Sequence, residues 1–479
     1  MVMLRWAIRL TGLVSTIILA RLLVPSDFGI VAMAMFVVGL LELLGDSGQE
    51  LAIIRHPSPM RDDYDTAWTV SVLVGLLIGA SIVALAPLAR LYFHEPRVVP
   101  VIQFLSLRSI MAGFQNIGAV DFRRDLRFNR FFVYNVVPKL FSFVVTISLA
   151  LAWRSYWALV AGILCSQLAM TVCSFVMHPY RPRLSLVKIS EVWSFSSWTL
   201  LRHVGTYLNS QIDQIVVGGI FGTSAMGRYA VAADVASSPS RELNEPMVAV
   251  LYPVMSKAHS DPETLRRLYL RSFAWSAMIC ISASVGVSMV AHDLVNLVLG
   301  KKWLDIEPFM GWLAWEAGLL GLCAGSYAAF DAIGKPRLGA KMQWARVVIL
   351  VMLLLPTALL LKNIIVMTVV RLIATALFLP ALLIASGREM NITLGDYGAV
   401  LWRPSLAACS MAVAISLSNS LMSEGIARLL CDVMLGAAIF AMVSIACWRA
   451  SGKPVAPEKD LIEAITRLIS KLGGRHMLQ

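Results

Sequence analysis

Apolar stretches of about 20 residues recur along the whole chain, and this is the length that an α-helix needs to cross a bilayer. Polar gaps separate the stretches, and we predict about fourteen membrane-spanning helices. In chain order they cover residues 4–24, 28–54, 66–92, 99–119, 131–152, 156–177, 191–221, 227–255, 266–299, 305–333, 341–361, 363–386, 398–418 and 426–447. The pattern therefore predicts an all-α polytopic membrane protein.

Charge alternates between successive gaps. The gap from Asp121 to Arg130 is rich in arginine, whereas residues 222–227 carry no charge. Later gaps are again cationic, with Arg181, Arg183 and Lys188, then Lys257, Arg266, Arg267 and Arg271, then Lys335, Arg337 and Lys341. Cationic loops stay in the cytoplasm, so the alternation predicts a multi-pass protein of the bacterial inner membrane. An even number of helices, with a cationic tail, places both termini in the cytoplasm.

The basic Asp121–Arg130 loop has two interpretations. It is either a determinant of topology alone or a contact for phosphate-bearing head groups at the cytoplasmic entrance.

Composition narrows the function further. The chain is 58% hydrophobic and only 15% charged, and its net charge of +12 lies mostly in short loops beside apolar stretches. Orientation in the membrane explains this excess better than a nucleic-acid partner does. The seven cysteines are scattered through apolar stretches, and the sequence has neither zinc-site spacing nor a glycine-rich phosphate loop. We expect no metal or organic cofactor, and we expect the first apolar stretch to be retained as a helix.

Local patterns recur between the two halves of the chain. Gly29 and Gly227 each follow a short serine-containing turn before a helix, 198 residues apart. Thr66-Ala67-Trp68-Thr69 matches Phe273-Ala274-Trp275-Ser276, and the pair Asp121 and Arg127 matches Asp331 and Arg337 in spacing. Each half holds about six helices and begins on the same side, which indicates a parallel repeat around a central cavity and alternating access.

The repeat suggests a division of the chain. We expect an N-terminal lobe over residues 1–185, a second lobe over 186–392, two further helices over 393–448, and a cytoplasmic tail over 449–479. Within the tail, Leu461, Ile462, Ile465, Leu468 and Ile469 share one helical face. Both a helix on the membrane surface and a loosely ordered tail fit this pattern.

Ionisable residues inside membrane helices are costly, so they usually face a cavity or a partner. Polar residues follow helical spacing on four of the predicted helices: Arg5, Arg9 and Thr16; Glu42, Asp46 and Glu50; Arg202, Thr206, Asn209 and Asp213; Asp234, Ser238, Arg241 and Glu245. We predict that the cations Arg9, Arg108, Arg202 and Arg241 bind an anionic substrate, since guanidinium matches phosphate geometry. The acids Asp46, Asp213 and Asp234 are candidates for a coupling-ion site or a gate. The alternative is interhelical ion pairing, for example between Arg202 and Asp234.

Several motifs resemble one protein family. They are the turn ARLLVPSDFG at residues 20–29, Gly45-Asp46-Ser47-Gly48 with Ile53-Ile54-Arg55, Thr66-Ala67-Trp68, and Leu297-Val298-Leu299-Gly300-Lys301-Lys302-Trp303. The chain resembles the polysaccharide transporter family, the flippases of lipid-linked O-antigen and exopolysaccharide repeat units, and within it the colanic-acid-exporter branch. The family belongs to the multidrug/oligosaccharidyl-lipid/polysaccharide (MOP) superfamily. The resemblance extends from about residue 10 to about residue 445.

The resemblance implies a MATE-like fold of two six-helix lobes plus two C-terminal helices. It implies undecaprenyl-pyrophosphate-linked oligosaccharide as the substrate, moved from the cytoplasmic to the periplasmic leaflet. It also implies coupling to H⁺ or Na⁺, a monomer in the bilayer, and a polysaccharide polymerase and glycosyltransferases as partners.

Three alternatives stay open. A multidrug or organic-cation antiporter would have a cavity dominated by acids and aromatics, whereas arginines accompany the acids here. A lipid II flippase would share the fold. A membrane enzyme of polysaccharide assembly would carry a large periplasmic loop with catalytic residues, and the predicted outer loops are short.

Overall fold

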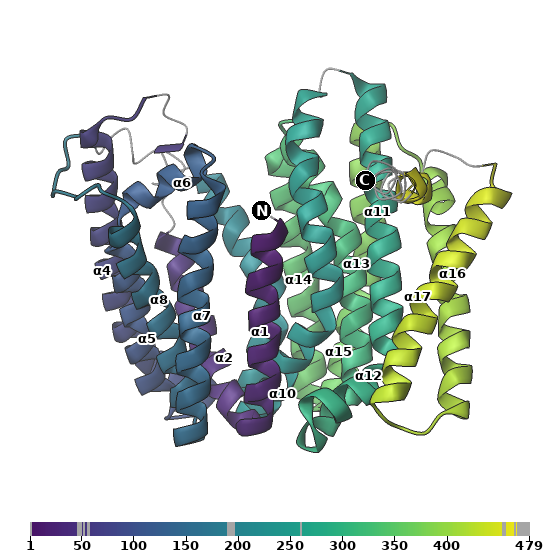
Figure 1. Ribbon diagram of the computed structural model, residues 1–479, viewed down its shortest axis with the longest axis horizontal. Helices are drawn as coiled ribbons and strands as arrows, with labels where there is room; N and C mark the ends of the chain where they lie inside the picture. Colours follow the sequence, from purple (N-terminus) through teal and green to yellow (C-terminus); the bar gives the residue numbers. More distant parts are fainter. Residues whose placement is uncertain are drawn as a thin grey trace, which may run out of the picture. The chain divides into compact units, whose positions relative to one another are not determined.

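The structure is a computed structural model, and it describes residues 2–45, 50, 53–54, 58–188, 197–258, 261–452, 457–463 and 466 (Figure 1). Side chains are described within these ranges except at residues 2–5, 44 and 197–202. The described chain is all-helical, as predicted, and divides into two compact units. One unit comprises Met1–Val231 with Ala358–Lys362, and the other comprises Ala232–Thr357 with Asn363–Gln479.

The first unit contains the N-terminal helices. They are α1 (Val2–Leu22), α2 (Pro25–Gly45), α4 (Arg61–Phe93), α5 (Val98–Gly113), a 3₁₀ turn (Ile117–Val120), α6 (Asp121–Arg124), α7 (Phe128–Trp153), α8 (Trp157–Met177) and the first part of α10 (Ser197–Lys257). Within it, α4 packs on α5 and α7 packs on α8.

The second unit contains the rest of α10 and the later helices. They are α11 (Pro262–Met289), α12 (Ala291–Asp293), a π-helical segment (Leu294–Leu299), a 3₁₀ segment (Lys301–Ile306), α13 (Glu307–Ala332), α14 (Pro336–Leu361), α15 (Ile364–Met390), α16 (Leu394–Leu421) and α17 (Ile426–Ala450). Its main core joins α11, α13 and α15, with Phe273, Phe330 and Leu382 fully or almost fully buried.

The number of long helical segments agrees with the sequence prediction. Eleven helices of the described chain are long and apolar enough to cross a membrane, or twelve if the bent pair Val98–Gly113 and Ile117–Arg124 is one span. The helix α1 and the break within α10 bring the number of long helical segments among the described residues to fourteen.

Several helix ends differ from the prediction for identifiable reasons. The helix α11 begins at Pro262 rather than at 266, because the Asp261 carboxylate accepts hydrogen bonds from the Glu263 and Thr264 amides and proline suits the first turn. It ends at Met289 rather than at 299, where α12 and the π-helical segment take over. The helix α14 likewise begins at a proline, Pro336.

The long helix α10 is broken at Gly222, which has φ +81°. Glycine adopts this left-handed conformation without the steric cost that other residues incur. Gly222 lies 198 residues after Val24, one of the two residues between α1 and α2, so the break in α10 corresponds to the turn between the first two helices. The two segments of α10 therefore correspond to α1 and α2.

A second observation supports the same offset of 198. A Cβ built on Gly29 would lie 1.8 Å from the Thr223 carbonyl oxygen, and a Cβ built on Gly227 would lie 1.8 Å from the Pro25 carbonyl oxygen. Thr223 is the repeat equivalent of Pro25, so the contact is reciprocal. The helix α2 and the second segment of α10 thus cross backbone to backbone at equivalent glycines, an approach that favours Cα–H···O contacts.

We expect Gly29→Ala and Gly227→Ala to destabilise the protein to a similar degree, because each methyl group would overlap a carbonyl oxygen and force the two helices apart. Overpacking of this kind costs about 1–3 kcal/mol. The measurement is the thermal unfolding midpoint of the purified protein in detergent.

Gly12→Ala is the matched control, since no atom lies within 4 Å of a Cβ built there. If either crossing variant unfolds at the same temperature as this control, the glycine contact does not hold the helices together.

Candidate functional site

Charged and polar side chains lie between helices in each of the two units. In the first unit, Arg108 of α5 donates to the Glu42 carboxylate of α2 at 2.8 Å, and the Ser109 hydroxyl donates to the other Glu42 oxygen at 2.8 Å. Both charged side chains keep partial exposure, 31% for Arg108 and 24% for Glu42. Arg108, a predicted substrate cation, is therefore held in an interhelical ion pair.

An aromatic contact joins α10 to α2, the helix that carries Glu42. The Tyr207 ring stacks on Phe36 with ring centroids 5.8 Å apart, and its hydroxyl donates to the Phe36 carbonyl at 2.8 Å. A Cβ on Gly39 would come within 2.6 Å of that hydroxyl, so the glycine makes room for the tyrosine. Sequence periodicity gave no indication of Tyr207.

The first segment of α10 turns part of its predicted polar face inward. Asn209 is 4% exposed and Asp213 is fully buried. The Asn209 amide donates to the Gly205 carbonyl one turn earlier, at 3.0 Å. Arg202 lies on the same helix, but its side chain is outside the described part, and Asp46 lies outside the described residues altogether. Arg9 is half-buried on α1.

The second segment of α10 carries the remaining predicted residues. Arg241 is exposed and donates to the Ser237 hydroxyl at 3.0 Å. Asp234 is half-buried, and its main-chain carbonyl accepts from the Ser238 hydroxyl. The nearby Asn244 is 3% exposed and connects α10 to α13 and α11 through the Gly321 carbonyl (2.9 Å) and Ser276 (2.8 Å).

A buried ionic cluster in the second unit was not predicted. Glu316 of α13 accepts from Arg346 of α14 at 2.9 Å and lies 3.2 Å from Nε of Arg371 on α15. Thr375 donates to the same carboxylate at 3.4 Å. The three charged side chains are 4–7% exposed. Removing one member of such a buried set costs about 3–5 kcal/mol, so this cluster fixes how α13, α14 and α15 pack.

A signal for this cluster was present in the sequence. Each of the three residues is an isolated ionisable group inside an apolar stretch, and the stretches belong to three successive helices. Such groups inside spans are usually paired. None of them has a second charged residue at helical spacing on its own helix, which is why the periodicity of charged residues does not reveal them.

A titratable group outside the spans lies on α12. His292 is hydrogen-bonded through Nδ1 to Glu307 at 2.8 Å, and its Nε2 lies 3.4 Å from Glu424. The hydrogen bond to Glu307 is the main reason that the pKa of His292 is raised above its ordinary value. The adjacent Asp293 accepts two bonds from Arg428, at 2.6 and 2.5 Å.

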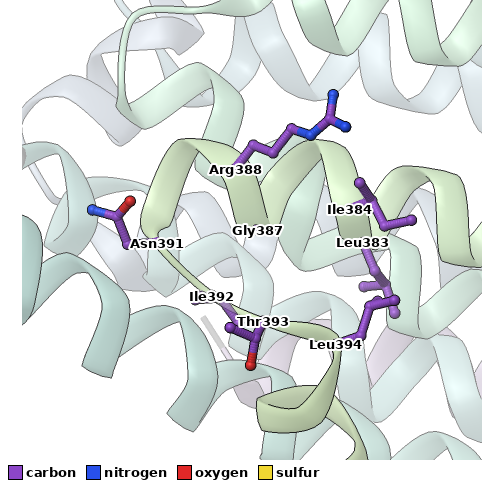
Figure 2. A pocket seen from close by; sticks show the side chains of 8 residues that line it. All are labelled: Leu383, Ile384, Gly387, Arg388, Asn391, Ile392, Thr393 and Leu394. Carbon is purple, nitrogen blue, oxygen red and sulfur yellow. The ribbon is translucent and has the colours of Figure 1, made fainter.

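A pocket with a volume of about 610 Å³ lies at the turn between α15 and α16. Figure 2 shows its lining residues: Leu383, Ile384, Gly387, Arg388, Asn391, Ile392, Thr393 and Leu394. Arg388 is the single charged group among them, and its side chain extends along α15 in this view. The lining is mainly apolar and lacks converging charged groups, so it carries no chemistry of its own.

Nothing among the described residues resembles a metal centre, since they contain no group of three or more His, Cys, Asp or Glu side chains arranged to hold an ion. The described polar groups are instead paired cations and acids on helices. Such an arrangement suits binding and movement of a charged solute.

Comparison with known proteins identifies the family. Residues 18–308 match the polysaccharide biosynthesis protein family. The lipopolysaccharide biosynthesis protein WzxC of Escherichia coli (strain K12) is 26% identical over 303 residues, which is 62% of this chain and 62% of that protein. The succinoglycan biosynthesis transport protein ExoT of Rhizobium meliloti (strain 1021) is 23% identical over 330 residues, 68% of this chain and 66% of that protein. The matched stretches thus span about two thirds of these relatives' own lengths.

Solved structures agree on the fold. The lipid II flippase MurJ, in an inward closed conformation, superposes with a TM-score of 0.73 at 13% identity and covers 94% of this chain and 98% of its own. An inward-facing multidrug resistance MATE transporter of the MOP superfamily superposes with a TM-score of 0.66 at 15% identity, covering 81% of this chain and 98% of its own. The predicted MATE-like fold is confirmed, and the chain belongs to the polysaccharide biosynthesis protein family of membrane proteins.

Proposed function

We propose that this protein is a flippase that moves undecaprenyl-pyrophosphate-linked oligosaccharide repeat units from the cytoplasmic to the periplasmic leaflet. The product serves the synthesis of a surface polysaccharide. The observation that carries the proposal is the family match over residues 18–308, together with relatives named for lipopolysaccharide and succinoglycan biosynthesis. The fold shared with a lipid II flippase supports a lipid-linked cargo.

The proposed mechanism is alternating access by the two repeat lobes, residues 1–185 and 186–392, in the bacterial inner membrane with both termini cytoplasmic. Arg9, Arg108, Arg202 and Arg241 hold the pyrophosphate and any acidic sugars. Asp46, Asp213 and Asp234 bind the coupling H⁺ or Na⁺, or act as gates. The protein works as a monomer beside glycosyltransferases and a polymerase, and it performs no covalent chemistry itself.

The ion pair between Arg108 and Glu42 refines this assignment. A phosphate binds guanidinium in the same bidentate geometry as a carboxylate, so cargo and Glu42 compete for Arg108. The role of Arg108 is therefore an exchange between two anionic partners. Among the predicted substrate cations whose side chains are described, Arg241 on α10 is exposed, whereas Arg9 is half-buried.

A multidrug antiporter is the second candidate, because MATE transporters share the fold. The sequence relatives argue against it, as does the presence of arginines on the predicted polar faces.

Deletion of the gene tests the function directly. We expect undecaprenyl-linked repeat units to accumulate and surface polymer to disappear, since assembly continues on the cytoplasmic side without transfer across the membrane. Mass spectrometry of lipid-linked oligosaccharides, together with quantification of surface polysaccharide, measures both and identifies the sugar. Unchanged polymer and intermediates, with altered drug susceptibility, would favour the antiporter instead.

We expect Arg241→Ala and Arg202→Ala each to abolish polymer export while membrane abundance stays at the native level, because each removes a cation that holds the cargo. Complementation of the deletion strain, with immunoblotting of membranes, measures the two quantities. Arg90→Ala, which removes an exposed cation in the last turn of α4, is the matched control and should export normally. Full export by both cavity variants would refute the cationic site.

A further inference from the structure

The chain does not leave the second unit at the end of α17. After the turn at Gly452, which has φ +78°, residues 457–463 form a short helical segment beside the C label in Figure 1. Pro457 and Glu458 are buried there, so the segment lies against the helices. The described part of the tail is thus docked on the second unit, whereas Ile465, Leu468 and Ile469 of the predicted helical face lie outside the described residues.

A buried ion pair holds the start of this segment. Glu458 accepts from Arg403 of α16 at 3.2 Å and from the Ser444 hydroxyl of α17 at 3.4 Å. The two charged side chains are only 8% and 5% exposed. An ion pair at this depth forms only in one geometry, because either charge left without its partner would carry a large desolvation cost.

A second ion pair connects the segment to α11. Asp460 accepts two hydrogen bonds from Arg271, at 2.7 and 3.1 Å, and one from the Trp275 indole at 3.4 Å. Bidentate pairs of this kind fix orientation as well as distance. One turn of the tail thus contacts α11, α16 and α17 together.

The first unit uses the equivalent place on its own helix. Trp275 corresponds to Trp68 of α4 in the repeat, and the segment that leaves α8 docks there. Tyr180 packs with Trp68 in one apolar cluster. The Arg183 and Ser185 amides donate to Asp65 and Thr69, each at 2.9 Å, one helical turn apart.

Two further contacts hold α16 and α17: an ion pair at the end opposite the tail and an apolar cluster midway along the helices. Arg428, near the start of α17, pairs with Asp293 of α12. Between the two ends, Val285 of α11 packs in an apolar cluster with Met411 of α16 and Phe440 of α17. The tail closes the set of contacts that joins these two helices to α11.

We propose that residues 457–463 are an ionic strap that fixes α16 and α17 to α11, so that the second unit moves as one body. Transport requires the strap to be docked, and this part of the proposal rests on the flippase function. The helices α16 and α17 lie outside the repeat. Besides the strap, the described ionic contact between them and α11 at this end is the more exposed pair of Arg266 with Asp396 of α16, at 2.9 Å.

Hydrogen–deuterium exchange of the full-length protein in nanodiscs tests docking without assuming any activity. Asp460→Lys should place two cations opposite each other, undock the segment, and speed amide exchange across residues 457–463 roughly tenfold. The charge swap Arg271→Asp with Asp460→Arg should restore native protection. Arg267→Asp is the matched control on the same helix, because the Arg267 side chain donates to Thr264 and has no described bond to residues 457–463. This variant should leave exchange unchanged.

Complementation of the deletion strain with each variant tests whether transport requires the docked strap. We expect Asp460→Lys to lower surface polymer severalfold at native abundance, and the swap to restore it. Native protection in Asp460→Lys would overturn docking through this pair. Lost protection with full export would overturn the requirement for transport, whereas failure of the gene deletion to change lipid-linked intermediates would reject the flippase function and leave the exchange result standing.

Discussion

The cost of an unpaired charge in an apolar environment organises this structure. A buried ionised group without a partner destabilises the folded protein by several kcal/mol. Removing one partner of an existing pair leaves the other charge with this full penalty. Glu316 therefore brings together Arg346 and Arg371 from two further helices, and Glu42 brings α2 to α5. These pairs therefore favour the arrangement in which α2 meets α5 and α13 meets α14 and α15, in addition to the apolar packing of the helices.

The fold was largely predictable, because hydropathy is a local property of the chain. The all-helical class and the positions of the long helices follow from the hydropathy of neighbouring residues. The repeat at Gly29 and Gly227 follows from motifs that recur in both halves of the chain. The site was predictable only in part. Periodicity identified the polar face with Asn209 and Asp213, and the structure buries both. It did not predict that Arg108 pairs with Glu42, since that pairing depends on which helices pack together, and no single-helix pattern contains this information.

The two units anchor their departing segments through different charged residues on corresponding helices. On α4, the acid Asp65 lies on the helix and the donors lie on the departing segment, whereas on α11 the cation Arg271 lies on the helix and the acid Asp460 lies on the tail. At the offset of 207 that relates Trp68 to Trp275, Asp65 corresponds to Ser272 and Arg271 corresponds to Tyr64, so the anchoring acid and the anchoring cation occupy different positions of the two helices. Each departing segment is therefore anchored by its own set of partners.

The proposed cargo has to enter this arrangement without creating an uncompensated charge. Under the flippase function, a pyrophosphate that binds Arg108 displaces Glu42, and the guanidinium stays neutralised throughout the exchange. The displaced Glu42 carboxylate is then the unpaired group, and it regains its partner by returning to Arg108 when the cargo leaves. The same pair that stabilises the empty protein would thus oppose tight retention of the cargo. A flippase gains from this balance, because a site that bound pyrophosphate with no competing anion would hold it too firmly to release it in the opposite leaflet.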